Sequence, residues 1–365
     1  MSGKILNYYA GGNTAQGFYS LYDSVLEGLN RLFILKGGPG TGKSSLMKEI
    51  GKQMVNKGLD IEYLHCASDN NSIDGIIIPE FQIGIVDGTA PHVIEPKVPG
   101  VIEEYVNLGE AWDSQKLAAK KNEILELNEA ITAKFNIAYE TFAAALKAHD
   151  DIEDIYISNM DFNEANKLTG ELITLFYGED TLNKIPKVKH RFLGAATPNG
   201  AVDFVQNLTS DIEKRYFIKG RAGSGKSTML KKIAAAGEEK GFDVEVYHCG
   251  FDPNSLDMVI IREKGIAIFD STAPHEYFPD RESDDIIDVY ERCITSGTDE
   301  KFAKEIQVAT KPYKDKMKEA ISYLAEAKAL RDELESYYID AMDFTKVDEI
   351  KKSIVEEFER IIDCK

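Results

Sequence analysis

The sequence lacks the features that mark secreted, zinc-binding and membrane proteins. Its 365 residues include only four cysteines, and none forms a CxxC pair. This usage excludes a disulfide framework and the usual structural zinc sites. No apolar run approaches the length of a membrane-spanning helix, and the first residues lack the apolar stretch of a secretory signal. We therefore expect a cytoplasmic protein without a membrane partner.

Positive charge is also scarce. The chain has 43 Lys and Arg residues against 62 Asp and Glu residues, for a formal net charge of −19. Such a surface repels nucleic acid, and no block of basic residues overrides it. We expect no nucleic-acid partner. The remaining composition is typical of a globular protein, and the length favours two domains.

The chain contains one unit twice. A shift of 183 positions aligns residues 36–96 with residues 219–279 without a gap, and 29 of the 61 positions are identical. The match returns where YISNMDF at 156–162 corresponds to YIDAMDF at 338–344. A repeat of this strength indicates a duplication. We expect two domains that associate as an intramolecular pseudo-dimer: residues 1–187 (core about 1–100, helical arm about 101–187) and residues 188–365 (core about 188–283, arm about 284–365).

Each unit alternates strands and helices in the same order. Apolar runs at 32–35 and 216–218 predict buried strands, and each precedes a glycine-rich turn and a helix, at 44–56 and 227–239. Further strands are expected at 60–65 and 83–86 and at the matching positions. This alternation predicts an α/β fold with a parallel, doubly wound sheet in each unit. Apolar residues at three- and four-residue steps then predict long helices, which we expect to form a helical hairpin on each core.

Both glycine-rich turns fit the pattern GxxxxGK[ST]. Glycines let successive backbone N–H groups point into one concave space, and the positive end of the following helix adds to the attraction for phosphate. We expect both turns to bind the phosphates of ATP. The residues concerned are Gly37, Gly38, Pro39, Gly40, Thr41, Gly42, Lys43, Ser44 and Ser45, and Gly220, Arg221, Ala222, Gly223, Ser224, Gly225, Lys226, Ser227 and Thr228.

Two residue types in these turns have specific roles in such a site. Lys43 and Lys226 would reach the β- and γ-phosphates, as catalytic residues. Ser44 and Ser227 would place a hydroxyl on Mg²⁺.

An aspartate ends the third expected strand of each unit. Asp87 and Asp270 would bind Mg²⁺ opposite the serine hydroxyl, as catalytic and metal-binding residues. The alternative is an aspartate that only stabilises a turn. Gly88 and Ser271 follow in place of the water-activating glutamate of many motor and helicase ATPases, which argues against those classes.

The segment Thr-Ala-Pro-His follows each of these acids. His92 and His275 would act as proton acceptor, substrate contact or orienting group, and packing in a proline-fixed loop is the alternative. A second repeated segment holds His65, Cys66 and Asp69 in the first unit. Its aspartate is a candidate base, whereas the adjacent His and Cys point to opposite faces of a strand and form no dyad.

These loops and acids resemble those of the P-loop NTPase superfamily. The doubled GxxxxGKS motif with D[GS]TAPH is similar to a bacterial family of tandem P-loop proteins whose members are labelled ATPase or nucleotide-kinase-like. The resemblance covers most of the chain and implies two P-loop NTPase cores that bind ATP and Mg²⁺. It implies no particular substrate.

Three functions are consistent with these motifs. The first is an ATPase that acts on the helical arms or on a protein partner, the second a kinase with a small-molecule or nucleotide acceptor, and the third an ATP-binding scaffold. Only one arginine, Arg31, precedes position 190, which leaves few arginines to clamp a transferring phosphate in the first unit. We therefore favour the ATPase. An arginine finger for the first site would come from the second unit, with Arg221 as a candidate.

Overall fold

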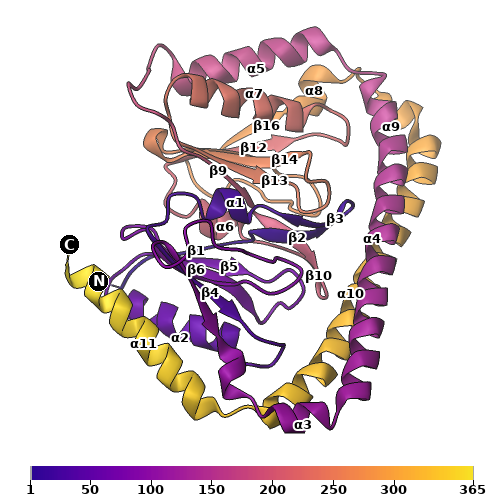
Figure 1. Cartoon of the computed structure of the whole chain (residues 1–365). Helices are drawn as coiled ribbons and strands as arrows, with labels where there is room; N and C mark the ends of the chain where they lie inside the picture. Colours follow the sequence, from indigo (N-terminus) through magenta and orange to yellow (C-terminus); the bar gives the residue numbers. More distant parts are fainter. Residues whose placement is uncertain (1, 365) are drawn as a thin grey trace.

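Two six-stranded β-sheets, one from each half of the sequence, organise the structure, a computed structural model that describes residues 2–364 (Figure 1). Met1 and Lys365, the outer ends of the two expected domains, lie outside the described residues. The fold is mixed α/β, as the sequence predicts, with helices on the faces of both sheets.

The two sheets have the same strand order. The first contains, from edge to edge, β1 (Ile5–Tyr8), β5 (Ile61–His65), β6 (Ile73–Ile78), β7 (Ile83–Asp87), β4 (Arg31–Lys36) and β8 (Glu103–Asn107). The second contains, in the same sense, β9 (Val188–Phe192), β13 (Val244–His248), β14 (Leu256–Ile261), β15 (Ile266–Asp270), β12 (Lys214–Lys219) and β16 (Asp285–Asp288). The repeated sequence therefore has a repeated topology.

Each sheet contains one antiparallel strand that the sequence analysis did not predict. β6 runs antiparallel to β5 and β7, and β14 runs antiparallel to β13 and β15. Only the residues 79–82 separate β6 from β7, whereas a parallel crossover needs a dozen residues or more. The expectation of a wholly parallel sheet is wrong for this reason. The other neighbouring strands of both sheets pair in parallel.

The two halves meet at a small sheet to which each contributes one hairpin. Its four strands are β2 (Gly11–Thr14), β3 (Gly17–Ser20), β10 (Gly194–Thr197) and β11 (Gly200–Asp203). β10 pairs with β2 at Ala196 and Asn13, and Tyr9 and Phe192 exchange two backbone hydrogen bonds of 3.0 Å beside them. Apolar side chains from both halves form one buried cluster at this junction.

One helix follows the glycine-rich loop of each half. α2 (Lys43–Asn56) buries Leu46, Met47, Ile50 and Met54 against the first sheet, at the three- and four-residue steps of an amphipathic helix. α7 (Lys226–Glu239) packs in the same way on the second sheet. The short helices are α1 (Tyr22–Val25), η1 (Leu108–Ala111), α3 (Ser114–Ala118), α6 (Val205–Leu208), η2 (Arg262–Lys264), α8 (Val289–Cys293) and α9 (Thr298–Lys301).

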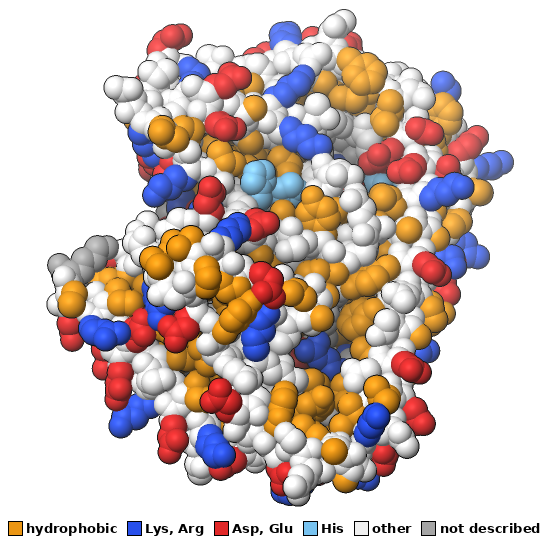
Figure 2. Space-filling view, in the orientation of Figure 1, with side chains coloured by type: hydrophobic (Ala, Val, Ile, Leu, Met, Phe, Trp, Pro, Cys, Tyr) orange, Lys and Arg blue, Asp and Glu red, His pale blue; other side chains and the backbone are white. Residues whose placement is uncertain are grey.

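Two long helices connect the ends of the molecule. α4 (Lys121–Ile157) and α10 (Ala303–Ala341) run side by side in opposite directions along one edge (Figure 1). Ala138 and Phe142 of α4 are buried with Ala320 and Leu324 of α10. Figure 2 shows hydrophobic side chains gathered where these helices face the sheets. The expectation of a helical hairpin within each unit is therefore wrong, because each long helix pairs with the long helix of the other half.

The last helix of each half packs on the core of the other half. α5 (Phe162–Tyr177), from the first half, joins the buried cluster of the second sheet and α7. α11 (Phe344–Asp363), from the second half, joins the cluster of the first sheet and α2. The long helices carry the chain across the molecule and so make this exchange necessary. Within residues 2–364, no helix is long and apolar enough to cross a membrane.

Candidate functional site

The first glycine-rich loop, residues 37–42, joins β4 to α2. Gly40 and Gly42 have φ angles of 70° and 89°, in the left-handed region that other residues seldom adopt. Gly42 is the N-cap of α2 and offers no side-chain cap to the N–H groups of the first turn. Amide groups at a helix N-terminus without a side-chain acceptor attract anions. The loop can therefore bind a phosphate group.

Lys43, the first residue of α2, lies against this loop. Its Nζ donates hydrogen bonds of 2.8 Å to the carbonyl oxygens of Gly37 and Gly38 and lies 3.6 Å from Oδ2 of Asp87. Asp87 comes this close because it ends β7, which pairs directly with β4. Burial lowers the pKa of Lys43, and the negative charge of Asp87 opposes this change.

The second loop repeats this geometry. Gly223 and Gly225 have φ angles of 69° and 83°. Lys226 Nζ donates a hydrogen bond of 2.7 Å to the carbonyl oxygen of Arg221 and lies 3.5 Å from Oδ2 of Asp270. The structure thus brings a predicted lysine and a predicted aspartate together in both halves.

The two predicted metal-binding serines also lie in matching positions. The hydroxyl of Ser44 accepts a hydrogen bond of 3.0 Å from the backbone N–H of Ile73, and that of Ser227 accepts one of 3.0 Å from Leu256. A hydroxyl has two lone pairs, so each keeps one for a cation. The other predicted loop residues occupy the same turns and the helix starts that follow: Pro39, Thr41, Ser45, Ala222, Ser224 and Thr228.

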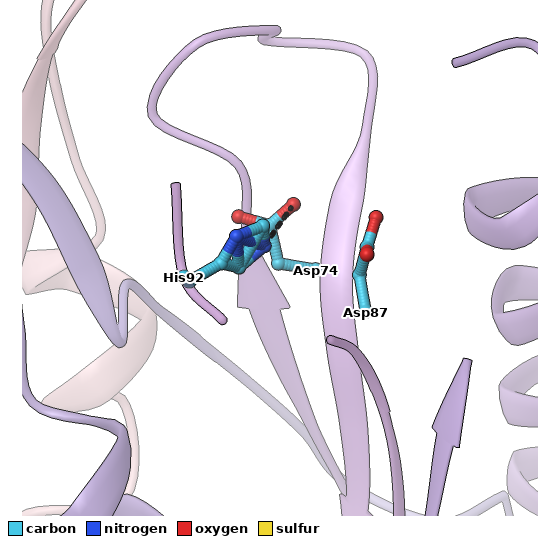
Figure 3. Close-up of side chains that lie close together, drawn as sticks. All are labelled: Asp74, Asp87 and His92. Carbon is cyan, nitrogen blue, oxygen red and sulfur yellow. Dashed lines mark ion pairs between the residues drawn. The ribbon is translucent and has the colours of Figure 1, made fainter. Parts of the chain in front are cut away.

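Three acidic and histidine side chains meet beside the first loop. Asp74 of β6, Asp87 of β7 and His92 are buried and face one another (Figure 3). Nε2 of His92 lies 3.6 Å from Oδ1 of Asp74, and Thr89 donates from its backbone and hydroxyl to Oδ1 of Asp87 at 2.8 and 2.6 Å. Burial raises the pKa of Asp74, and the charge of His92 opposes this rise.

The second half arranges the corresponding residues differently. Nδ1 of His275 lies 2.8 Å from Oδ2 of Asp203, and the Tyr277 hydroxyl donates to the other oxygen of Asp203 at 2.7 Å. Burial lowers the pKa of His275, but the hydrogen bond with Asp203 and the negative charges of Asp203, Asp257 and Asp270 together outweigh burial, and the net pKa is raised. Oδ2 of Asp257 is buried and has no hydrogen-bond partner in the part of the chain that the structure describes, and burial raises the pKa of Asp257 to about 6. In the first half, Ser20 stands in the place of Asp203.

The environment of the repeated His–Cys segment disfavours a thiolate. Burial raises the pKa values of Cys66 and Cys249 well above the ordinary value for a thiol. Burial also lowers the pKa of His65 to about 4, and its Nε2 lies 2.8 Å from Oδ1 of Asn7. Asp69 of the same segment accepts a hydrogen bond of 2.7 Å from the Ser72 hydroxyl, in a local turn.

A long helix from the other half lies on each loop. A Cβ atom on Gly40 would come within 2.7 Å of the carbonyl oxygen of Glu335 in α10. A Cβ atom on Gly223 would come within 2.6 Å of the carbonyl oxygen of Glu153 in α4. Glycine is therefore required at these positions for close packing as well as for φ, and each site is completed by the opposite half.

Arg331 of α10 is the arginine that the second half brings to the first loop. Its side chain is 26% exposed, and within residues 2–364 its only ion pair is with Glu335, at 3.6 Å. Its positive charge contributes to the lowered pKa of Lys43 after burial, which is the main cause. The corresponding residues of α4 are His149 and Glu153, which lie 3.6 Å apart and line the second site.

Arg221 does not reach the first site. Its guanidinium pairs with Asp299 at 2.8 Å and lies over the ring of Tyr290, 4.8 Å from the ring centroid. Both partners belong to the second half, so the hypothesis that Arg221 serves the first loop is wrong. The reason is the exchange of helices, which brings α10 and not the second loop to the first site.

A cavity of about 590 Å³ adjoins the second loop. Its polar wall contains Lys226, Asp257, Asp270 and His275. Its apolar wall comes from the loop after β13 and from both long helices, and includes Leu146, Phe251, Tyr313, Met317 and Ile321. This volume lies within the range of about 300–1,000 Å³ that is usual for small-molecule sites.

Comparison of the chain with protein-family models, with curated proteins and with solved structures gives no match. The interpretation of both sites therefore depends on their geometry.

Sequence reasoning missed three contributors to these sites. Asp74 recurs as Asp257 in the repeat, but the strand that carries it into the site was not predicted. Arg331 and Asp203 lie outside the gapless alignment of residues 36–96 with residues 219–279, so no local pattern marks them. The absence of other early arginines was the one available signal for an arginine supplied by the second half.

Proposed function

We propose that the chain is a Mg²⁺-dependent ATPase with two P-loop sites, one in each half. The observation that carries this proposal is the repeated grouping of a glycine-rich loop, a buried lysine at a helix start and a strand-end aspartate. The Nζ–Oδ2 distances are 3.6 Å for Lys43 and Asp87 and 3.5 Å for Lys226 and Asp270. Two matching groups of this kind support nucleotide binding more strongly than either motif alone.

The residues present suit ATP and Mg²⁺. Uncapped helix N-termini and a lysine supply donors for phosphate oxygens, and the aspartates and serine hydroxyls supply the oxygen ligands that Mg²⁺ prefers. Bound Mg²⁺ would neutralise charge that develops on the phosphates. In the first site the guanidinium of Arg331 would add a positive charge from the other half, which would stabilise the charge of the transition state as an arginine finger does.

We further propose that hydrolysis changes how the two halves are arranged. The backbone of Gly40 packs against α10 and that of Gly223 against α4, so a shift of either loop must move the opposite half. α4 and α10 pack along each other, and α10 reaches both sites, with Glu335 against the first loop and Tyr313 in the cavity of the second. A movement of one loop would therefore alter the position of the other loop.

Phosphate release without any acceptor tests the ATPase. We expect the full-length protein to release phosphate from ATP with Mg²⁺, the Lys43→Ala and Lys226→Ala variants to lose one site each, and the double variant to lose both. Tight ATP binding without release would favour a scaffold. No binding of ATP to either loop would refute the proposal altogether.

A kinase at the second site is the second candidate, and the cavity favours it. Its apolar wall extends beyond the loop and leaves room for an acceptor beside Asp257 and His275. Transfer of labelled γ-phosphate from ATP to small molecules, in the Lys43→Ala background, separates this candidate from hydrolysis. Label recovered only as inorganic phosphate would exclude it.

A further inference from the structure

Asp74, Asp87 and His92 form a group with the dimensions of a metal site. One ligand atom of each residue lies within 4.8 Å of the other two, and all three side chains are buried (Figure 3). Two of the residues come from adjacent antiparallel strands and the third from the loop after β7. Two ligand atoms that each lie about 2.0–2.2 Å from an ion are up to about 4.4 Å apart. The three side chains would therefore have to move only slightly closer together to bind an ion.

His92 is the observation that points to a ligand. It is 6% exposed, and among residues 2–364 neither of its ring nitrogens has a hydrogen-bond partner. A buried polar group without a partner is costly, so native structures rarely retain one without a reason. The rings of Tyr22 and Phe18 lie 5.3 and 6.0 Å from the imidazole, and its Nε2 points to Asp74. A cation between imidazole and carboxylates would satisfy the nitrogen.

The set of donors indicates which cation fits. Two carboxylates and one imidazole suit divalent first-row transition metals, because imidazole is a good ligand for zinc, iron and nickel and carboxylate for manganese. Mg²⁺ prefers oxygen ligands and retains its waters. The backbone and hydroxyl of Thr89, which donate to Oδ1 of Asp87, would orient this carboxylate as outer partners of metal ligands do.

We propose that the first half binds one divalent transition-metal ion through Asp74, Asp87 and His92, before any nucleotide binds. The ion would lie beside the first glycine-rich loop, because Asp87 also lies 3.6 Å from Lys43. The proposal uses only residues of this chain and does not depend on the proposed ATPase.

The second half provides the matched control. Its residues at the same positions are Asp257, Asp270 and His275, but Nδ1 of His275 is paired with Asp203. Within residues 2–364, only the first half groups three possible ligands this closely. The same residue types thus give one site and not two.

Cobalt(II) titration of the full-length protein tests the proposal. The protein is freed of metal with a chelator, no nucleotide is added, and visible absorption of bound Co²⁺ is recorded. We expect one equivalent of Co²⁺ per chain in the wild type and in His275→Ala and Asp257→Asn. We expect affinity to fall at least about tenfold in His92→Ala and in the isosteric Asp74→Asn, as loss of a ligand requires.

Three results would overturn the proposal. The first is that Co²⁺ causes no absorption change in the wild type. The second is that His92→Ala and His275→Ala lower the Co²⁺ affinity equally. The third is that an equal concentration of Mg²⁺ displaces the bound Co²⁺. Far-UV circular dichroism of each variant ensures that a loss is not due to unfolding. Lys43→Ala should still bind Co²⁺. A wild-type protein that binds Co²⁺ but releases no phosphate from ATP would contradict the proposed ATPase and not the metal site.

Discussion

The two loops share their glycines and backbone angles, but their surroundings differ. The first faces Arg331 and Glu335 of α10, and the second faces His149 and Glu153 of α4. Near the first loop His92 has no hydrogen-bond partner among the described residues, whereas near the second His275 is paired with Asp203. The repeated motif thus gives both halves the same loop, lysine and aspartate, while the groups around each loop come from residues that differ between the halves.

This difference predicts unequal sites. An arginine at the first loop favours charge stabilisation during hydrolysis, because a guanidinium keeps its charge at every physiological pH. The histidine at the corresponding place over the second loop is a weaker substitute. We therefore expect the first site to account for most of the ATP turnover, with the second site more suited to binding a nucleotide or a second molecule in its cavity.

Loss of the loop lysines should have the largest effect. Lys43→Ala should remove most phosphate release, by about a hundredfold or more, because the lysine acts on the charge of the transferring phosphate. Lys226→Ala should have a smaller effect on turnover and remove a separate population of bound ATP. Phosphate release and ATP-binding stoichiometry measure the two effects. Equal losses of turnover in the two variants would show that the sites do not differ in this way.

Substitutions in the exchanged helices α5 and α11 should have an effect on stability of similar size. The ring centroids of Phe358 in α11 and Phe33 are 5.8 Å apart, and those of Phe176 in α5 and Tyr216 are 4.8 Å apart. Truncation of a buried Phe costs about 3–5 kcal/mol. We expect Phe358→Ala to destabilise the first core although the residue lies near the C-terminus, and Phe176→Ala to destabilise the second.

Denaturant unfolding followed by tryptophan fluorescence separates these two variants. Trp112 is the single tryptophan, and its ring lies 6.0 Å from that of Tyr338, near the first loop. Phe358→Ala should lower the midpoint of the fluorescence transition more than Phe176→Ala does. The reverse order would argue against the exchange of α5 and α11.

Arg331→Ala should lower turnover at the first site by about a hundredfold, which corresponds to about 2.7 kcal/mol of transition-state stabilisation. The measurement is steady-state phosphate release in the Lys226→Ala background, with ATP affinity measured separately. The matched control is His149→Ala in the Lys43→Ala background, where a smaller effect is expected. If Arg331→Ala changes ATP affinity alone, the arginine serves binding and not hydrolysis.

A buried ion pair distinguishes the second core from the first. Asp284 accepts hydrogen bonds of 2.9 and 2.6 Å from Arg215, whose counterpart in β4 is the apolar Leu32. Burial by itself would raise the pKa of Asp284. The hydrogen bonds that its carboxylate accepts, of which the bond from Arg215 contributes most, together outweigh burial and lower the pKa to about 2. Because the folded pKa lies below the unfolded value, this stabilisation is present above about pH 4 and is lost as pH falls towards 2.

Asp284→Asn should therefore lower the free energy of unfolding by about 2 kcal/mol at pH 7 and by much less near pH 2. Urea unfolding at several pH values measures this difference. Leu32→Ala in the first core is the comparison, since its cost should not depend on pH. A constant cost for Asp284→Asn across this range would show that the carboxylate charge does not stabilise the second core.

Much of the architecture followed from local sequence. The repeat, the strand–loop–helix order and the left-handed glycines were predictable because each depends on neighbouring residues. β6 was missed because its run of residues, IDGIII, shows no alternation of polar and apolar residues and is buried throughout. The amphipathic pattern of the long helices predicted their length but not their partner, since an apolar face does not specify which other helix covers it.

By itself the sequence determined two copies of a loop that can bind phosphate, with a lysine and an aspartate near each. Those features lie within short segments whose conformation depends on glycines and strand endings. Only the tertiary structure decided that α10 brings Arg331 to the first loop, that α5 and α11 are exchanged, and that His92 faces two carboxylates. These contacts join residues that are far apart in the chain. They depend on how complementary surfaces pack together and not on the local conformational preferences of the residues.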